Sequence, residues 1–234
     1  MSTKGVRKAS EIRSAYEQLI QQFRIVGESV NCEVVLPSRP VQASFTESRS
    51  DASVAFKTLL YLRGWRCRHL ASGKRLDIVI KVEEAFLKPS WCLTKSRVVL
   101  NYIIVSNSSA KLAQSLRYDF VDNGQPDHPF FHVHLSDEII QDDELPSMGF
   151  RLGLAVQPNE CRVTTRIPTP DMTLASVLYC VVADHVGAGQ FREFAEKVHS
   201  IQDRLSHPGF EALKQSLKIP LKHFKSSHWF AHMR

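Results

Sequence analysis

The chain has 234 residues, of which 43% are hydrophobic and 23% are charged, and its formal net charge is +6. This composition is typical of a globular protein that buries a core, and it excludes a chain that is disordered throughout. No apolar run is long enough to cross a membrane as a helix, and the basic first residues lead into an amphipathic pattern rather than a signal-peptide core. The five cysteines are scattered without a C-x-x-C pair, which argues against a disulfide framework or a zinc knuckle. We therefore expect a cytoplasmic protein.

The N-terminal part of the chain, about residues 8–64, is expected to be mainly helical. Apolar residues recur at helical spacing between residues 10 and 26, and this spacing predicts a first helix. Ser50 can cap a second helix over about residues 51–63, and Gly64 can end it.

The middle of the chain, about residues 76–136, predicts a sheet. Its segments are rich in Val and Ile or alternate polar with apolar residues, and both patterns are typical of strands. Short connections between consecutive strands favour an antiparallel meander. The expected strands, with one short strand ahead of the sheet, cover residues 33–36, 76–82, 97–105, 111–121 and 130–136.

After Pro170 the helical spacing returns, and C-terminal helices are expected over about residues 170–220. Gly187 separates the first of these helices from the second, and a short third helix follows Pro208. Strands in the middle and helices at both ends predict an α+β protein whose antiparallel sheet is covered mainly on one face. No low-complexity linker or internal repeat divides the chain, so we expect a single domain over residues 1–234.

Two neighbouring predicted strands carry polar residues that can share one face. Side chains alternate between the faces of a strand, so Arg117 and Asp119 point the same way. His132 and His134 do the same on the next strand. If the two strands pair, the four side chains can converge, in a register that the sequence does not specify.

Two histidines with an acid and an arginine suit acid–base work on a phosphodiester. One imidazole removes a proton and the other donates one, while Asp119 orients an imidazole and Arg117 offsets the developing charge. A transition metal is an alternative, held by His132, His134, Asp119 and Glu138. A structural face is a further alternative, because polar strand faces often carry histidines that bond to their neighbours. No motif identifies a cofactor: partial matches to the cupin and two-histidine phosphoesterase signatures each lack their second element.

Basic residues gather between Lys57 and Lys81, where seven lysines or arginines accompany a single acid. Such a field attracts phosphate, and Trp65 can stack on a base beside it. The alternative is a core tryptophan among solvated arginines. The acidic stretch from Asp137 to Glu144 can instead dock a basic partner. The candidate nucleic-acid-binding residues are Arg63, Trp65, Arg66, Arg68, Lys74 and Arg75.

Three short motifs within about residues 110–185 carry a family resemblance. They are Leu-Arg-Tyr-Asp-Phe at 116–120, the string from His128-Pro129 to His132-Val133-His134, and Arg-Ile-Pro-Thr-Pro at 166–170 before a helix. Together they resemble a bacterial family, domain of unknown function 2290, and there is a looser likeness to small toxins of toxin–antitoxin pairs. The resemblance implies a strand–strand–helix core and a setting in prokaryotic defence or mobile elements. Its matching positions are Arg117, Asp119, His132, His134 and Arg166.

These observations predict a nucleic-acid-directed protein of a bacterial defence or toxin–antitoxin type system, acting as a ribonuclease through His132 and His134. RNA or DNA, and a protein encoded nearby, are the expected partners. The alternatives are a non-enzymatic binding subunit of a larger complex and a metal-dependent small-molecule enzyme.

Overall fold

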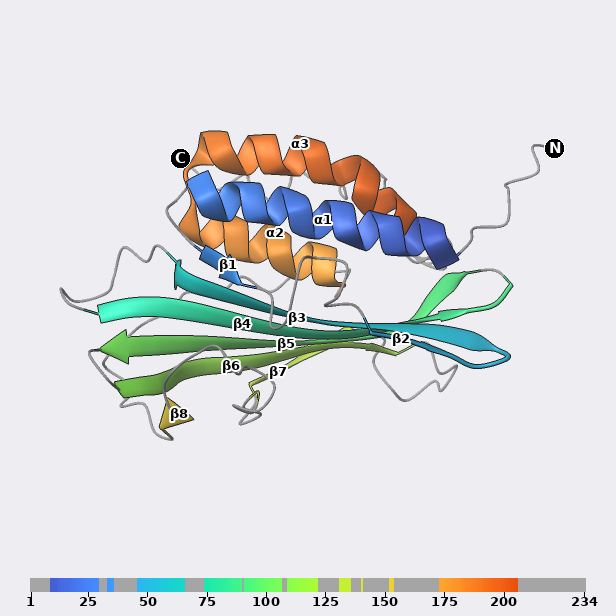
Figure 1. The fold of residues 1–234 in the computed structure, drawn as a ribbon, viewed down its shortest axis with the longest axis horizontal. Coiled ribbons are helices and arrows are strands. Elements are labelled where there is room, and N and C mark those ends of the chain that lie inside the picture. The colour runs from blue at the N-terminus through green and yellow to red at the C-terminus, as the bar shows by residue number, and fades with distance from the viewer. Residues whose placement is uncertain are drawn as a thin grey trace.

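The computed structural model describes residues 9–29, 33–35, 46–65, 74–89, 91–106, 109–121, 131–135, 140, 152–153 and 173–205. In these residues the protein is α+β, as expected, with its helices on one face of a long antiparallel sheet (Figure 1). The helices are α1 (Ala9–Ser29), α2 (Leu174–His185) and α3 (Ala188–Leu205). The strands are β1 (Glu33–Val35), β2 (Thr46–Arg49), β3 (Ser53–Trp65), β4 (Lys74–Leu87), β5 (Cys92–Ser106), β6 (Ser109–Val121), β7 (Phe131–Leu135) and β8 (Leu152–Gly153).

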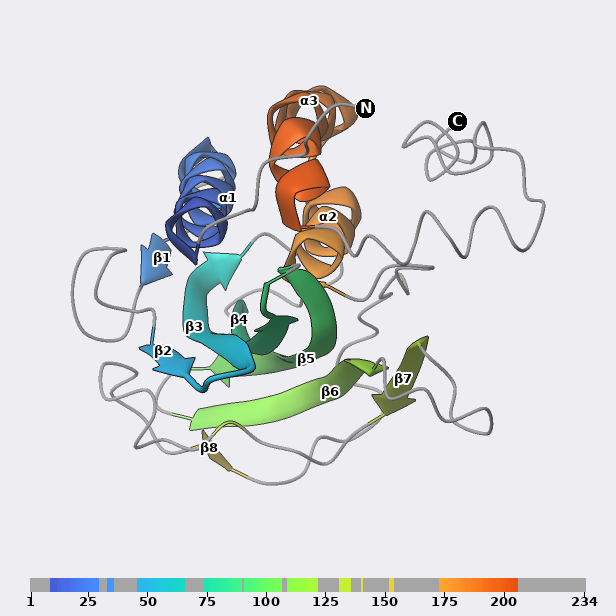
Figure 2. The same cartoon turned by 90° about the vertical axis from the view of Figure 1, so that its right-hand side faces the viewer.

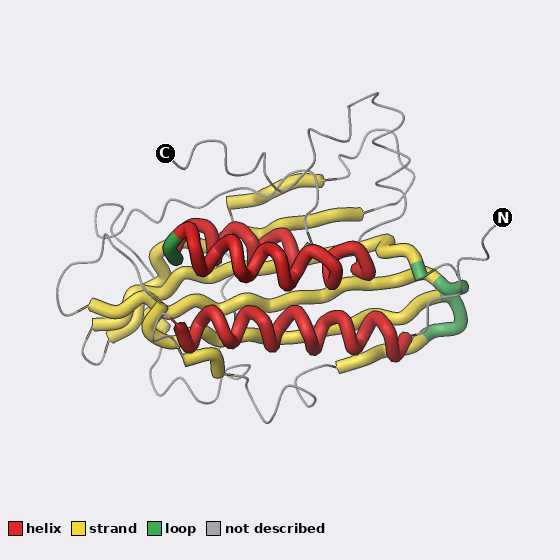
Figure 3. The backbone as a smooth tube through the Cα atoms, turned by 90° about the horizontal axis from the view of Figure 1, so that it is seen from above, coloured by secondary structure: helices red, strands yellow, loops and turns green. Residues whose placement is uncertain are grey.

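The sheet is an antiparallel meander from β3 to β7, which confirms the expected topology. Its strand order is β1-β3-β4-β5-β6-β7, while β2 also pairs with β3, and the short β8 runs parallel to β6. Seen from above, the helices run along the direction of the strands (Figure 3). Seen along the strands, all three described helices lie on the same side of the sheet (Figure 2). We call the opposite side of the sheet the distal face.

The prediction of a helix over residues 51–63 is wrong, because residues 53–65 form β3. Burial along this segment alternates, with Val54, Phe56 and Leu60 turned into the core, and this period of two belongs to a strand. Ser50 closes a turn instead of capping a helix: its backbone N–H donates to the Ser53 carbonyl at 2.9 Å. The N-terminal part therefore contains one described helix followed by strands.

The first predicted helix is confirmed as α1, which packs one face against the sheet and α3. Its Phe23 ring stacks on Trp65 at the end of β3, with ring centroids 5.4 Å apart. The same ring meets Phe194 of α3 edge-on, with centroids 6.2 Å apart. The buried residues recur at the three- and four-residue spacing of an amphipathic helix. They are Ile12, Ala15, Tyr16, Leu19, Ile20, Phe23, Val26 and Gly27.

The predicted C-terminal helices are confirmed as α2 and α3, whereas the expected short third helix lies outside the described residues. The N-cap of α2 is Thr173, whose hydroxyl accepts a hydrogen bond from the Ser176 backbone N–H at 3.5 Å. Most residues of α2 are buried, because this helix contacts α1, α3 and β5. No helix in the described part of the chain is long and apolar enough to cross a membrane.

A buried carboxylate, Glu84 of β4, fastens the helices to the sheet. It is 1% exposed and lies on the helix-covered face. Ser96 of β5 donates to Glu84 Oε1 at 2.8 Å, and the backbone N–H of Leu174 at the start of α2 donates to the same oxygen at 2.8 Å. The Tyr16 hydroxyl of α1 donates to Glu84 Oε2. Hydrogen bonds to an ionised acceptor are the stronger kind, and a negative charge at a helix N-terminus is favourable.

Replacement of Glu84 is expected to be costly. Glu84→Leu leaves three buried donors without their acceptor and should lower the free energy of unfolding by about 3 kcal/mol. Glu84→Gln keeps an acceptor oxygen and should cost about 1–2 kcal/mol. Urea denaturation measures both values.

The matched control is Glu83→Gln, because Glu83 is the adjacent residue on the opposite face and its side chain is 35% exposed. It should change stability by less than about 1 kcal/mol, as expected for a partly solvated ion pair. Equal losses in the Glu83 and Glu84 variants would contradict the fastening role of Glu84.

Candidate functional site

Pairing of β6 with β7 places the predicted site residues on the distal face. Asp119 is opposite His132 and Arg117 is opposite His134 in the antiparallel register. The intervening Tyr118 is buried in the core under the helices. The expected shared face of these four positions is therefore present, although the side chain of His132 lies outside the described residues.

Three of these side chains form a compact group, which we call the Arg–Asp–His cluster: Arg117, Asp119 and His134. Arg117 Nε donates to Asp119 Oδ2 at 2.6 Å. His134 Nε2 lies 3.6 Å from the same carboxylate oxygen, an ion-pair distance when the imidazole is protonated. The side chain of Asp119 is 12% exposed, whereas those of Arg117 and His134 are 31% and 45% exposed. The cluster thus combines a nearly buried acid with two solvent-accessible nitrogen groups.

The cluster belongs to a longer row of charges that crosses the sheet. The register aligns Lys57 of β3 with Glu83 of β4, Glu83 with Arg97 of β5, and Arg97 with Asp119. Opposite charges face one another at each step, an arrangement that stabilises cross-strand pairs. We call the row and its charged neighbours the charged band. Its described members are Lys57, Lys81, Glu83, Lys95, Arg97, Arg117 and Asp119, so five cations less two carboxylates give +3.

Glu83 lies in the middle of the charged band between two lysines. Its Oε2 is 3.4 Å from Lys57 Nζ, and its Oε1 is 3.4 Å from Lys95 Nζ. Burial alone would raise the pKa of Glu83, but the two ammonium charges and their hydrogen bonds outweigh it and lower that pKa. The small stabilisation from this carboxylate is therefore present above the ordinary glutamate pKa and is lost as the pH falls through the lowered value.

A second apolar cluster covers the distal face beside the charged band. Val79, Val99 and Ile103 are buried there with Tyr61, and Ile140 packs onto them. The backbone N–H of Ile140 donates to the side-chain oxygen of Asn101 at 3.0 Å, which holds this residue against the sheet. The distal face is therefore divided into a covered apolar part and an exposed charged part.

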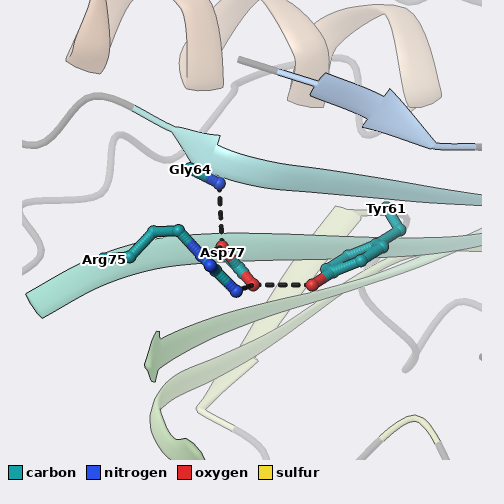
Figure 4. A network of polar contacts seen from close by, with 4 residues as sticks. All are labelled: Tyr61, Gly64, Arg75 and Asp77. Atoms are coloured by element: carbon teal, nitrogen blue, oxygen red, sulfur yellow. Dashed lines mark hydrogen bonds and ion pairs between the residues drawn. The ribbon is translucent and has the colours of Figure 1, made fainter. Parts of the chain in front are cut away.

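Asp77, at the far end of the distal face, is the centre of a hydrogen-bond network (Figure 4). It is fully buried, and it accepts from the Tyr61 hydroxyl at 2.6 Å and the Gly64 backbone N–H at 2.8 Å. Arg75 donates to it twice, from Nε at 2.8 Å and from a terminal nitrogen at 3.0 Å. Burial and the hydrogen bond to Asp77 raise the pKa of Tyr61, and the hydrogen bond to Asp77 raises the pKa of Arg75. The guanidinium of Arg75 is therefore engaged in a structural ion pair with Asp77.

The predicted nucleic-acid-binding set is only partly accessible. Trp65 is 2% exposed within the core, so the structure contradicts its proposed stacking on a base and supports the alternative of a core tryptophan. Arg63 is exposed and Lys74 is half-buried. Arg66 and Arg68 lie outside the described residues, as do Arg166, Glu138 and most of the acidic stretch around it.

The charged band is not apparent in the sequence. Its members come from β3, β4, β5 and β6, and Lys57 was assigned to a helix that does not exist. The available signal was the alternation of charges at Lys81, Glu83, Lys95 and Arg97, which share one face of β4 and β5, although Glu83 and Lys95 lie just outside the predicted strands.

Within the described residues, no group of three or more His, Cys, Asp or Glu side chains is arranged to hold a metal ion. Comparisons with family models, with curated proteins and with solved structures find no match to the chain.

The different roles of two arginines at the far end of the distal face can be tested. Arg75→Met removes a charge partner of the fully buried Asp77 and should lower the free energy of unfolding by about 2 kcal/mol. Arg63→Met, at an exposed position, should change it by less than about 0.5 kcal/mol. Thermal or urea unfolding of the two variants measures the difference, and equal stabilities would contradict the structural role of Arg75.

Proposed function

We propose that the protein acts on nucleic acid in a bacterial defence or toxin–antitoxin type system, and that it cleaves RNA at the Arg–Asp–His cluster. The observation that carries the proposal is the position of this cluster at one end of a charged band with a net charge of +3. A positive field on an accessible face attracts the phosphate backbone. The acid, the imidazole and the guanidinium are residue types that can act on a phosphodiester once it is bound.

The proposed reaction is an internal transesterification of RNA. One histidine removes the proton of a ribose 2′-hydroxyl, and that oxygen attacks the adjacent phosphorus. The bond from phosphorus to the 5′ oxygen breaks, and the second histidine donates a proton to the departing oxygen. The products are a 2′,3′-cyclic phosphate and a 5′-hydroxyl end, so no further reactant is needed.

Each member of the site has a defined role in this scheme. His132 and His134 are the acid–base pair, and they belong to positions two residues apart on one strand face. Asp119 orients His134 from 3.6 Å. Arg117 stabilises the charge that develops on the phosphate. Its Nε–H is bonded to Asp119, and the other N–H donors of the guanidinium are on its terminal nitrogens.

The bacterial setting is supported by the resemblance of three short motifs to the domain of unknown function 2290, and by the looser likeness to small toxins. Two of these motifs contain the four proposed site residues. The third lies outside the described residues.

A non-enzymatic binding subunit is the second candidate. It is favoured by the ion pairs within the charged band, since Lys57 and Lys95 both reach Glu83, and Arg117 reaches Asp119. Cross-strand charge pairs stabilise a sheet face without any catalytic role. In this case the protein should co-purify with the product of the neighbouring gene, and replacement of the histidines should not change that complex.

The catalytic proposal is tested by His132→Ala combined with His134→Ala. Loss of both proton-transfer groups should slow RNA cleavage by between about a hundredfold and ten-thousandfold. Cleavage is measured on a single-stranded RNA labelled at one end, and the cyclic phosphate is identified by mass spectrometry.

The control protein is Arg24→Gln, purified in the same way, because Arg24 is exposed on α1 in the helical layer. It should cleave like the unchanged protein, and a DNA strand of the same sequence should remain intact because it lacks the 2′-hydroxyl. Equal cleavage by the double histidine variant and the control would disprove the catalytic role.

A further inference from the structure

The charged band extends well beyond the Arg–Asp–His cluster. From β3 to β6 it crosses three strand spacings, and β7 adds a fourth to reach His134, or roughly 19 Å in all at about 4.8 Å for each spacing. Lys57 lies at the β3 end, and His134 lies at the β7 end. A polynucleotide bound at the cluster can therefore reach Lys57 only by running across the strands.

We infer that the charged band binds the backbone of single-stranded RNA laid across the strands, with Lys57 and Lys95 as phosphate-binding positions outside the Arg–Asp–His cluster. This inference rests on the proposed function and names its substrate class. The two lysine side chains are 53% and 45% exposed, and both extend from strands that fix their position. Ammonium groups at such positions suit the regular phosphates of a single strand.

The layout of the charged band favours one strand over a duplex. Its charges occupy three neighbouring rows of side chains, which are roughly 7 Å apart along a strand. Only the middle row, from Lys57 to Asp119, has a charged side chain on every strand from β3 to β6. The two flanking rows also contain apolar residues, such as Val99 beside Lys81 and Ala85 beside Lys95. The band therefore offers one continuous line of charges, which suits one line of phosphates rather than the two lines of a duplex.

The described members of the charged band are all charged side chains, and none of them is aromatic. Its members are lysine, arginine and carboxylate side chains, and Tyr61 nearby is buried and bonded to Asp77. Without an exposed aromatic ring among these residues, bases have no stacking platform on the band. Binding should therefore depend strongly on salt and only weakly on sequence.

Replacement of Glu83 should change the affinity for RNA in the opposite direction from replacement of the two lysines. Its carboxylate lies between Lys57 and Lys95 and offsets their charge where a phosphate would bind. Glu83→Gln removes this anion and leaves both lysines, so the affinity for RNA should rise several-fold. Lys57→Gln combined with Lys95→Gln should lower the affinity on the order of tenfold, and the slope of log K against log salt should decrease in magnitude by about 1.4.

The experiment measures fluorescence anisotropy of a labelled 2′-O-methyl RNA of about ten nucleotides, a length within the range of single-strand sites. The blocked 2′-hydroxyl prevents the proposed cleavage, so binding is measured independently of catalysis. The matched control is Arg24→Gln combined with Lys197→Gln on the helical layer. These side chains are 49% and 46% exposed, and each pairs with a glutamate, as Lys57 and Lys95 do.

Stronger binding by Glu83→Gln and weaker binding by the Lys57 and Lys95 double variant, with the control unchanged, would support the inference. It would hold even if unmodified RNA were not cleaved, in which case the ribonuclease proposal alone fails. Equal weakening by the control variant would show a general effect of net charge and overturn it. Equally tight binding of duplex RNA, or displacement of the RNA by a polyglutamate peptide of equal charge, would also overturn it.

Discussion

The carboxylate of Glu84 is the interaction on which the layered arrangement depends. One side chain accepts hydrogen bonds from α1, from β5 and from the first N–H of α2, so it sets the position of two helices against the middle of the sheet. A negative charge at this depth is stable only with such donors. Apolar packing around it is less directional, because rings such as Phe56 and Phe86 can be replaced by others of similar volume.

Two adjacent residues of β4 lie on opposite faces of the sheet and have different roles there. Glu84 is fully enclosed by the helical layer, whereas Glu83 lies on the distal face among lysines. All three described helices are on one side of the sheet, and the other side has both an apolar cluster and the charged band. Among the described residues, Ile140 covers the apolar part of the distal face and leaves the charged band accessible.

The sequence predicted the helices at both ends and the meander, because their periodicities are long and unambiguous. The prediction of a helix over residues 51–63 was wrong, because Ser50 and Gly64 are residue types that often begin and end helices. The strand is evident only from its pairing with β4. Alternation correctly placed Arg117 with Asp119 and His132 with His134, but their alignment required the register. The charged band was missed for the same physical reason: its residues meet only across strands. The sequence left Trp65 open between a base-stacking residue and a core residue, because it does not reveal the ring of Phe23 that covers it.

Twist of the meander has a geometric consequence for whatever lies along the charged band. Neighbouring strands of a sheet rotate by roughly 20–25° in one direction, so the strand direction changes steadily from β3 to β7. The line of positions from Lys57 to His132 therefore follows the twist of the sheet and curves in one sense, rather than running straight. A flexible polymer can wind along such a curved line, whereas a rod with the stiffness of a double helix would touch it at a single point.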